Sequence, residues 1–332
     1  MDAVIKQRDF KPDFFKGLAI LFILLWHFGF VATQYFIWAI PLFVFTTAAL
    51  YQDRIERLTL KKILQQAIWI FGLIVVFTIL ADSFGLVKIV KTNFSWSIGG
   101  LFKYYILRNP FLGALWYFVL YFQELLLLWI IGKLDYKKVS SWGFGFIFFI
   151  IGLIWSYLVL RIFSEGVTFN IFSWIFFIWL GLFQYKNIFS FLEKKSNTFK
   201  LICVVVLAGI IFFILYSAGA PYLQYLKLRT HDPLLPTIVL QLCYFFVIFS
   251  VTAIKELKGL LKLFGMLGFF SMYIYIFHQF FYDVVFTEAG FGVADLLLTV
   301  LACIIVGLMF EKIRNALFGE RPVTTQMGSV NK

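Results

Sequence analysis

The sequence predicts an all-α polytopic integral membrane protein, a single bundle of about ten transmembrane helices with both termini in the cytosol. Apolar residues make up 62% of the 332-residue chain and charged residues only 14%, whereas a soluble domain carries roughly 25% charged residues. Forty-five phenylalanines leave too little polar surface to cover a water-soluble globule. Long apolar runs indicate membrane-spanning helices, and an uneven distribution of basic residues between the connecting segments indicates their orientation.

A helix needs about 20 apolar residues to cross the hydrocarbon core of a bilayer. The runs are continuously apolar rather than alternating, which favours helices over a β-barrel, and a helix satisfies its own backbone in lipid. We therefore predict one transmembrane domain over 1–317 and a disordered cytosolic tail over 318–332. The predicted spans, of which the second and sixth are short, are 15–34, 36–51, 65–84, 113–132, 141–160, 170–185, 200–218, 236–254, 264–286 and 292–311.

The loop charges test these spans, because Lys and Arg concentrate in segments that stay in the cytosol. With the N-terminus placed inside and the sides alternated, 22 of the 29 Lys and Arg residues fall in cytosolic segments and seven in outer ones. The bias predicts the orientation, with the plasma membrane as the default location. The net charge of +12 is then explained by loops that meet anionic lipid, so nucleic acid is not an expected partner.

The cysteines do not indicate a disulfide or a metal site. Cys203, Cys243 and Cys303 all lie inside apolar runs, their number is odd, and no pair has metal-ligand spacing. The sequence also contains no Walker loop, GxSxG or HExxH motif. We therefore expect no metal cofactor.

Ionisable side chains inside apolar spans are candidates for function, because a charge in lipid is costly. His27 follows Lys16 by 11 residues, about 16 Å along a helix. A neutral imidazole at this depth can act as a general base toward a hydroxyl, or it can donate structurally to a neighbouring helix. Lys16 can reach a phosphate or extend to the interface, and Asp13 equally suits a helix N-cap.

Two later spans carry further candidates. Glu124 lies within the fourth span, where a carboxylate must be protonated or paired, and it would face either His27 or a cytosolic lysine. His278 lies in the ninth span near Tyr275. His278 suits either a functional site or the polar tip of an aromatic belt at the interface, and Glu124 suits either a structural or a functional role.

The segment DFFKGLAILFILLWH over 13–27 resembles the opening of the family-3 integral-membrane acyltransferases. There an Asp, two apolar residues, Arg or Lys and a Gly precede an apolar span that reaches a His. Three later segments are similar to later parts of that family and stand in the expected order. They are IPLFVFTTAALYQ at 40–52, GALWYFVLY at 113–121 and LGFFSMYIYIFHQFF at 267–281.

The resemblance implies transfer of an acyl group, often acetyl, from acyl-coenzyme A to a hydroxyl of a carbohydrate or glycolipid acceptor. It implies that His27 is the catalytic residue and that Lys16 lies near the donor, with Asp13 beside it in the motif. We add Glu124 and His278 as catalytic candidates, and Tyr275 as a donor that would stabilise the oxyanion.

The chain departs from the family pattern at the cytosolic start of the third span. Lys61 and Lys62, followed by Gln65 and Gln66, stand where many members carry a pair of arginines, and Lys replaces Arg at position 16. Lysine binds phosphate as a point charge rather than as a fork. Lys61 and Lys62 are still candidates for donor binding, but the affinity or identity of the donor can differ, or activity can be lost.

The alternative function is transport or flipping of a lipid-linked sugar or polymer, and a non-catalytic membrane subunit is a third. In a transporter His27, Glu124 and His278 would line a polar path. Against transport, no repeat relates the two halves, and no pair of spans is interrupted by Gly or Pro. Against an inert subunit, the spacing between Lys16 and His27 would have to be accidental.

Overall fold

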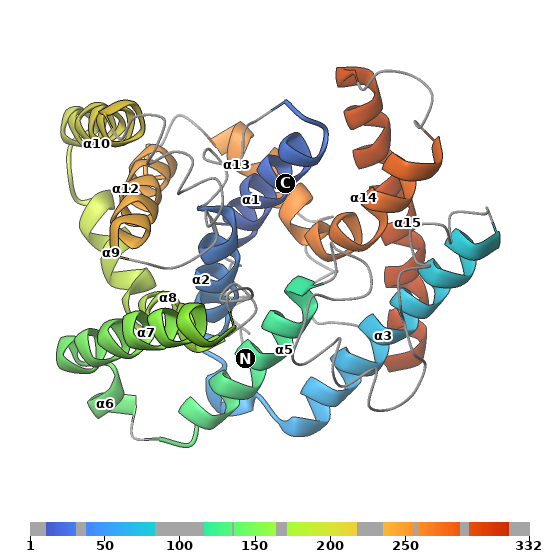
Figure 1. Cartoon of the computed structure of the whole chain (residues 1–332), viewed down its shortest axis with the longest axis horizontal. Helices are drawn as coiled ribbons and strands as arrows, with labels where there is room; N and C mark the ends of the chain where they lie inside the picture. The colour runs from blue at the N-terminus through green and yellow to red at the C-terminus, as the bar shows by residue number, and fades with distance from the viewer. Residues whose placement is uncertain are drawn as a thin grey trace, which may run out of the picture.

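The structure is a computed structural model, and all regular secondary structure in the residues that it describes is helical (Figure 1). The all-α prediction is therefore confirmed. The connections between predicted spans over 85–112 and 219–235 and the predicted tail over 318–332 lie almost wholly outside the described residues. The described ranges are 11–30, 38–83, 116–134, 136–163, 171–217, 235–254, 258–285 and 292–318.

Each predicted span coincides with helical residues, although the boundaries differ. The sixth span is longer than predicted, because 3-10, α and π segments follow one another without a gap from residue 171 to 193. The elements are α1 (Lys11–His27), α2 (Ala39–Tyr51), η2 (Ile55–Arg57), α3 (Leu60–Ser83), α5 (Trp116–Ile131), α6 (Tyr136–Val139), α7 (Trp142–Phe163), η6 (Ile171–Trp174), α8 (Ile175–Trp179), η7 (Leu180–Gln184), α9 (Tyr185–Glu193), α10 (Asn197–Ser217), α12 (Leu235–Thr252), α13 (Lys258–Phe269), α14 (Ser271–Val285) and α15 (Val293–Phe318).

Helix α1 ends at His27 rather than continuing to residue 34 as predicted. Gly29 has a φ of 74°, in the left-handed region that glycine adopts without strain. Its N–H donates to the Trp26 carbonyl at 3.0 Å, and the Phe30 N–H donates to the Leu25 carbonyl at 2.8 Å. This pair of bonds is a common glycine-dependent helix ending, and it places His27 in the last turn of α1.

The prediction of one helix over 264–286 is wrong, because α13 ends at Phe269 and α14 begins at Ser271. Helix α13 packs along α1, and the contact is made through glycines. A methyl group on Gly268 would come within 1.6 Å of the Asp13 carbonyl oxygen, and one on Gly17 within 1.8 Å of the Phe264 carbonyl oxygen. The pairs 13 with 268 and 17 with 264 show that the two helices run in opposite directions where they touch. The break allows α13 to follow α1 while α14 turns to pack on α15.

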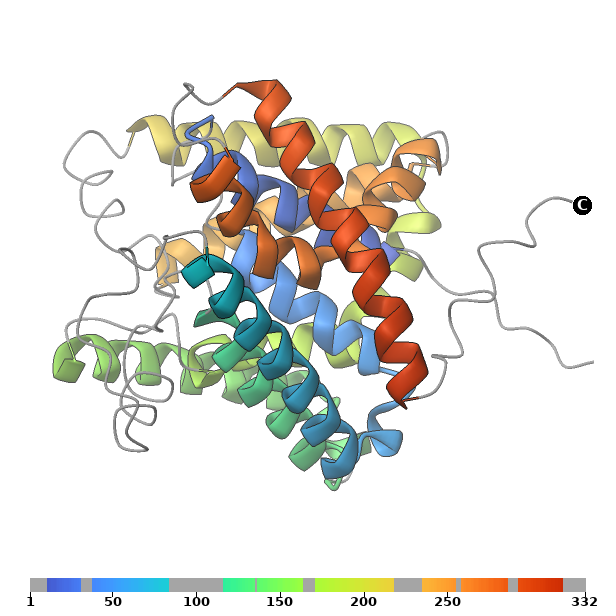
Figure 2. The same ribbon diagram turned by 90° about the vertical axis from the view of Figure 1, so that its right-hand side faces the viewer.

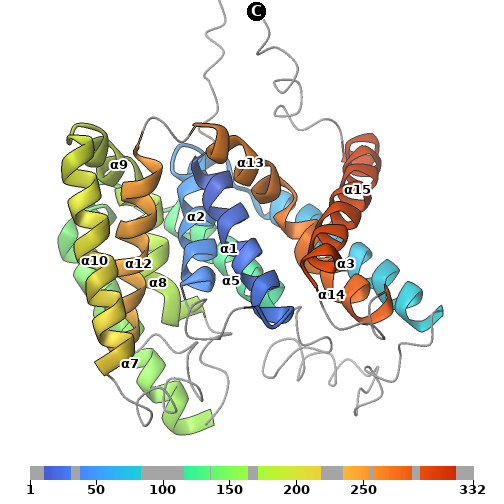
Figure 3. The ribbon, with the colours of Figure 1, turned by 90° about the horizontal axis from the view of Figure 1, so that it is seen from above.

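Helices α1 and α2 lie between two groups of helices, with α9, α10 and α12 on one side and α3, α14 and α15 on the other (Figure 3). Every residue of α2 from Ala39 to Ala49 is buried. Helix α2 contacts α1, α5, α8 and η7, so it is surrounded by protein. Complete enclosure explains why this short segment is apolar on all sides.

The outer helices expose apolar side chains. On α15, which crosses the face shown in Figure 2 together with α3, Leu297, Leu301 and Met309 are exposed. Among the described residues, Ile171–Glu193 and Val293–Phe318 are long and apolar enough to cross a membrane, by length and composition. These surfaces fit a membrane protein, while the number of spans and the side on which the termini lie stay predictions.

A buried polar contact joins α14 to α15. The Tyr273 hydroxyl donates to the Glu311 carboxylate at 2.7 Å, and Arg314 pairs with the same carboxylate at 3.3 Å. Hydrogen bonds to a charged partner are stronger than those between neutral groups. This contact therefore stabilises α14 in one position against α15.

Candidate active site

Helices α1 and α14 bring two imidazoles together, because the His27 and His278 rings lie 5.0 Å apart between their centres. His278 is 1% exposed, whereas His27 is only partly buried. The sequence had marked both residues as catalytic candidates without relating them to each other. The structure places them in one site, with the partly exposed ring at the end of α1.

The His278 side chain bonds back to its own helix. Its Nδ1 lies 3.0 Å from the Ile274 carbonyl oxygen and 2.8 Å from the Tyr275 carbonyl oxygen. Its Nε2 is buried and makes no hydrogen bond to any described residue. One nitrogen of this imidazole is thus held by backbone, while the other makes no hydrogen bond to a described residue.

Tyr275 is buried beside the two histidines. Its ring centre lies 5.9 Å from that of His278 and 5.6 Å from that of Tyr117. Its phenol oxygen accepts a hydrogen bond from the backbone N–H of Tyr117, in the first turn of α5, where N–H groups have no partner within the helix. The O–H of Tyr275 keeps its capacity to donate, which is the property required of a group that stabilises an oxyanion.

Glu124 is fully buried on α5 and interacts electrostatically with Lys16 of α1. Of the two partners predicted for it, His27 or a cytosolic lysine, the structure places the lysine beside it. The backbone of Ala48 and the side chain of Tyr117 are also close. Neither carboxylate oxygen makes a hydrogen bond of ordinary geometry to a described residue, so Lys16 is its main source of electrostatic stabilisation.

The remaining donor-binding candidates lie at the ends of α1 and α3. Asp13 is buried in the first turn of α1, two residues after the helix begins, so it is not the N-cap. Lys61 and Lys62 are exposed at the start of α3, and the Lys62 ammonium donates to the Arg57 carbonyl at 2.9 Å.

Tyr117 is a site residue that the sequence interpretation did not single out. It contacts Tyr275 through its ring and lies near Glu124 and the Thr47 hydroxyl. The signal was available, since Tyr117 precedes Glu124 by seven residues and therefore shares a face of a helix with it. The hydrogen bond from its backbone to Tyr275 could not be read from that spacing.

Together these groups can perform acid–base chemistry on a hydroxyl. Two imidazoles can accept protons, a phenol can donate a hydrogen bond, and a lysine paired with a carboxylate lies toward the start of α1. In the part of the chain that the structure describes, no three His, Cys, Asp or Glu side chains gather as metal ligands would.

A family model described as an acyltransferase domain matches residues 9–310. The matched range contains all of the site residues described above. A search of curated proteins and a search of solved structures found no match.

Proposed function

The chain belongs to the acyltransferase domain family, and from this premise we propose that it transfers an acyl group from acyl-coenzyme A to a hydroxyl of a carbohydrate or glycolipid. Membership of the family makes the chain a transferase that moves acyl groups, as the resemblance of 13–27 implied. The donor, the acceptor and a multi-pass location in the plasma membrane are our proposal. The observation that carries it is the contact between His27 and His278, whose ring centres lie 5.0 Å apart. Beside them lies Tyr275, whose phenol oxygen accepts a hydrogen bond from the Tyr117 backbone.

His27 acts as the general base in this mechanism. It takes the proton of the acceptor hydroxyl while the oxygen attacks the thioester carbonyl carbon. The Tyr275 O–H donates a hydrogen bond to the oxyanion that forms. When the carbon–sulfur bond breaks, the thiolate leaves and takes the proton from His27, so the products are an ester and free coenzyme A.

Lys16 supports the proposed donor site because it lies in the same helix as His27. The spacing of 11 residues corresponds to about 16 Å along α1. This distance suits a donor whose anionic phosphates stay near Lys16 while its thioester reaches His27. Lys61 and Lys62 are exposed, and with the other basic residues of the predicted cytosolic segments they would attract the anionic donor.

The test is hydrolysis and transfer of labelled acetyl-coenzyme A by the protein purified in detergent. We expect slow hydrolysis of the thioester without acceptor, and a fall of at least about 100-fold in His27→Ala, because general base catalysis contributes 10²–10⁴-fold. His231→Ala is the matched control, since it removes the third histidine of the chain, to which the proposal assigns no role. Circular dichroism and gel filtration check that both variants fold.

Two results would contradict the proposal. One is equal thioester hydrolysis by the unmodified protein and by folded His27→Ala. The other is counterflow of a labelled glycolipid across vesicles that contain the protein, without any acylation, which would favour the transporter.

A further inference from the structure

The position of the ring proton on His278 follows from its neighbours. Nδ1 lies 3.0 Å and 2.8 Å from two backbone carbonyl oxygens, which can only accept hydrogen bonds. Nδ1 must therefore carry a hydrogen. A neutral imidazole has one N–H, so Nε2 presents a bare lone pair.

The Nε2 atom that carries this lone pair is one of the unsatisfied polar atoms of the site. It is buried and has no partner among the described residues, and a buried acceptor without a donor costs free energy. Among the described residues, the rings of His27 and Tyr275 pack against His278. The oxygen of Tyr275 is held at the backbone N–H of Tyr117, so of these two rings His27 is the one able to supply a donor.

The spacing of the two rings suits a hydrogen bond between them. A ring nitrogen lies about 1.1 Å from the imidazole centre, so a nitrogen–nitrogen distance of about 2.9 Å puts the centres about 5 Å apart. The observed separation is 5.0 Å, with 51° between the ring planes. The separation of the rings is therefore compatible with an N–H of the partly exposed His27 ring that reaches Nε2 of His278.

We propose that His278 is a positioning residue that accepts the ring N–H of His27 and so fixes its tautomer. The second nitrogen of His27 is then bare and faces the acceptor hydroxyl. This role rests on the proposed acyl transfer, in which His27 is the base. When His27 takes the hydroxyl proton, its bond to His278 becomes charge-assisted and stronger, so His278 stabilises the transition state more than the resting state.

The choice of histidine as the orienting group also has a physical reason. A carboxylate in this position would orient the base, but it would have to be buried as a charge, which is expensive in a dry interior. A neutral imidazole held by two carbonyls supplies the same lone pair without that cost. Its Nδ1–H is kept in place by α14 itself.

Two substitutions of His278 distinguish the role of the Nε2 lone pair from that of the hydrogen bonds between Nδ1 and the backbone. In His278→Asn the amide nitrogen can still donate to the Ile274 and Tyr275 carbonyls, but nothing replaces Nε2. In His278→Gln the longer side chain can place an amide oxygen near the position of Nε2. We expect kcat of folded His278→Asn to fall about 10- to 100-fold with little change in donor KM, and His278→Gln to retain more activity. Full activity of His278→Asn would overturn the proposal.

A second measurement reads the tautomer without using activity. The chain contains three histidines, so ¹⁵N-histidine labelling gives a small set of ring signals in which protonated and bare nitrogens are distinct. His231→Ala and His27→Ala assign the signals. We expect His278 to carry its proton on Nδ1, and His27 to change from one tautomer to a mixture in His278→Asn.

The activity measurement and the tautomer measurement distinguish failure of the proposed function from failure of the positioning role. If the unmodified protein transfers no acyl group while the tautomers are as expected, the proposed function is wrong and the contact between the histidines stands. If acyl transfer occurs but His278 carries its proton on Nε2, or the His27 tautomer is unchanged in His278→Asn, the positioning role is wrong.

Discussion

Lys16 and Glu124 form an electrostatic pair between helices that are far apart in the sequence. Glu124 is fully buried, while Lys16 keeps part of its surface open. A buried carboxylate that loses its counter-charge is strongly destabilised, so Lys16 stabilises Glu124 in its buried position on α5. The same ammonium remains the candidate for the donor phosphate, and substitutions can separate the two roles.

We predict that Lys16→Met lowers both stability and affinity for coenzyme A. Because Lys16 is only partly buried, the loss of stability is about 1–3 kcal/mol, less than for a fully buried pair. Adding Glu124→Gln in the double variant removes the stranded charge, so stability recovers while donor affinity stays low. Thermal unfolding in detergent and calorimetric titration with coenzyme A measure the two effects.

Lys194→Met is the control, since it removes an exposed lysine from a predicted cytosolic segment. A double variant that is no more stable than Lys16→Met would show that the two side chains do not stabilise each other. Unchanged coenzyme A affinity in Lys16→Met would remove Lys16 from the donor site.

At the scale of elements, the crossing of α1 and α13 depends on two glycines. Gly17 and Gly268 let the backbones approach so closely that a methyl group on either would overlap a carbonyl of the other helix. Small residues at helix crossings serve this purpose in membrane proteins, where close packing replaces the hydrophobic effect between helices. The crossing holds the turn of α1 that contains Asp13 and Lys16.

We expect Gly268→Ala to destabilise the protein by about 1–3 kcal/mol or more, because the added methyl meets backbone that cannot rotate away. Thermal unfolding in detergent measures the change. Gly209→Ala is the matched control, since Gly209 is also helical and nothing lies within 4 Å of an added methyl. There alanine should be neutral or stabilise by about 0.5–1 kcal/mol, as in other helix interiors. Equal melting temperatures of the two variants would contradict the packing of α1 on α13.

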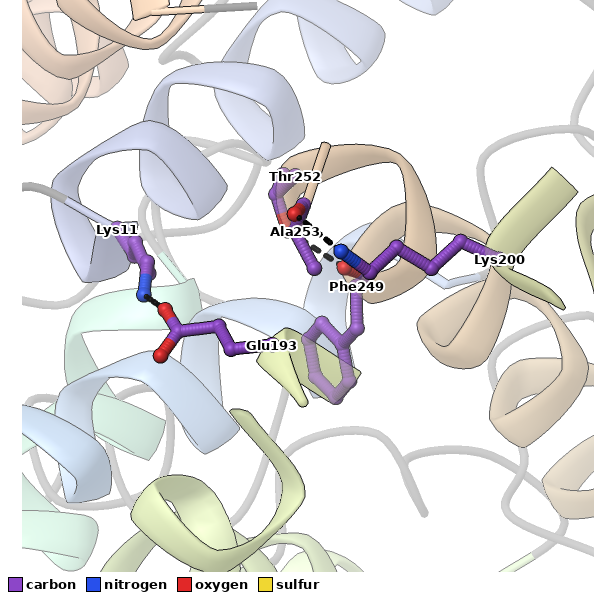
Figure 4. Close-up of polar contacts among 6 residues, drawn as sticks. All are labelled: Lys11, Glu193, Lys200, Phe249, Thr252 and Ala253. Carbon is purple, nitrogen blue, oxygen red and sulfur yellow. Dashed lines mark hydrogen bonds and ion pairs between the residues drawn. The ribbon is translucent and has the colours of Figure 1, made fainter. Parts of the chain in front are cut away.

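At the scale of the whole molecule, polar contacts join segments that the charge alternation assigns to the cytosolic side. Lys11 at the start of α1 pairs with Glu193 at the end of α9, and the buried Lys200 donates to the Ala253 carbonyl at 2.9 Å (Figure 4). Lys186 binds Asp53, with 2.6 Å between its ammonium and Oδ2. The contacts place these helix ends together at one end of the bundle, as one common side of a membrane requires.

Thiol labelling in cells tests the orientation. In a chain whose three cysteines are replaced by alanine, Lys194→Cys should react with a membrane-impermeant reagent only after the membrane is permeabilised. Phe30→Cys should react in intact cells, because Phe30 is 42% exposed just beyond His27 at the other end of α1. Labelling of both positions from the same side would contradict the predicted topology.

The helical fold class, the approximate positions of most helices and the family could be predicted from the sequence. Hydropathy is a local property, and Lys16 and His27 lie within one helix, so both could be recognised without a partner. The end of α1 was missed although Gly29 carries its signal, because the apolar run continues past the turn. Hydropathy alone does not distinguish a helix from an apolar segment that follows it.

The tertiary structure alone decided which of these residues meet. The pairing of His27 with His278, of Glu124 with Lys16 and of Tyr275 with the first turn of α5 each joins segments that are remote in the chain. The break at Phe270 arises in the same way, since α13 must follow α1 through Gly268 while α14 packs on α15. Such contacts depend on how helix faces fit one another, and no local pattern of residues encodes that fit.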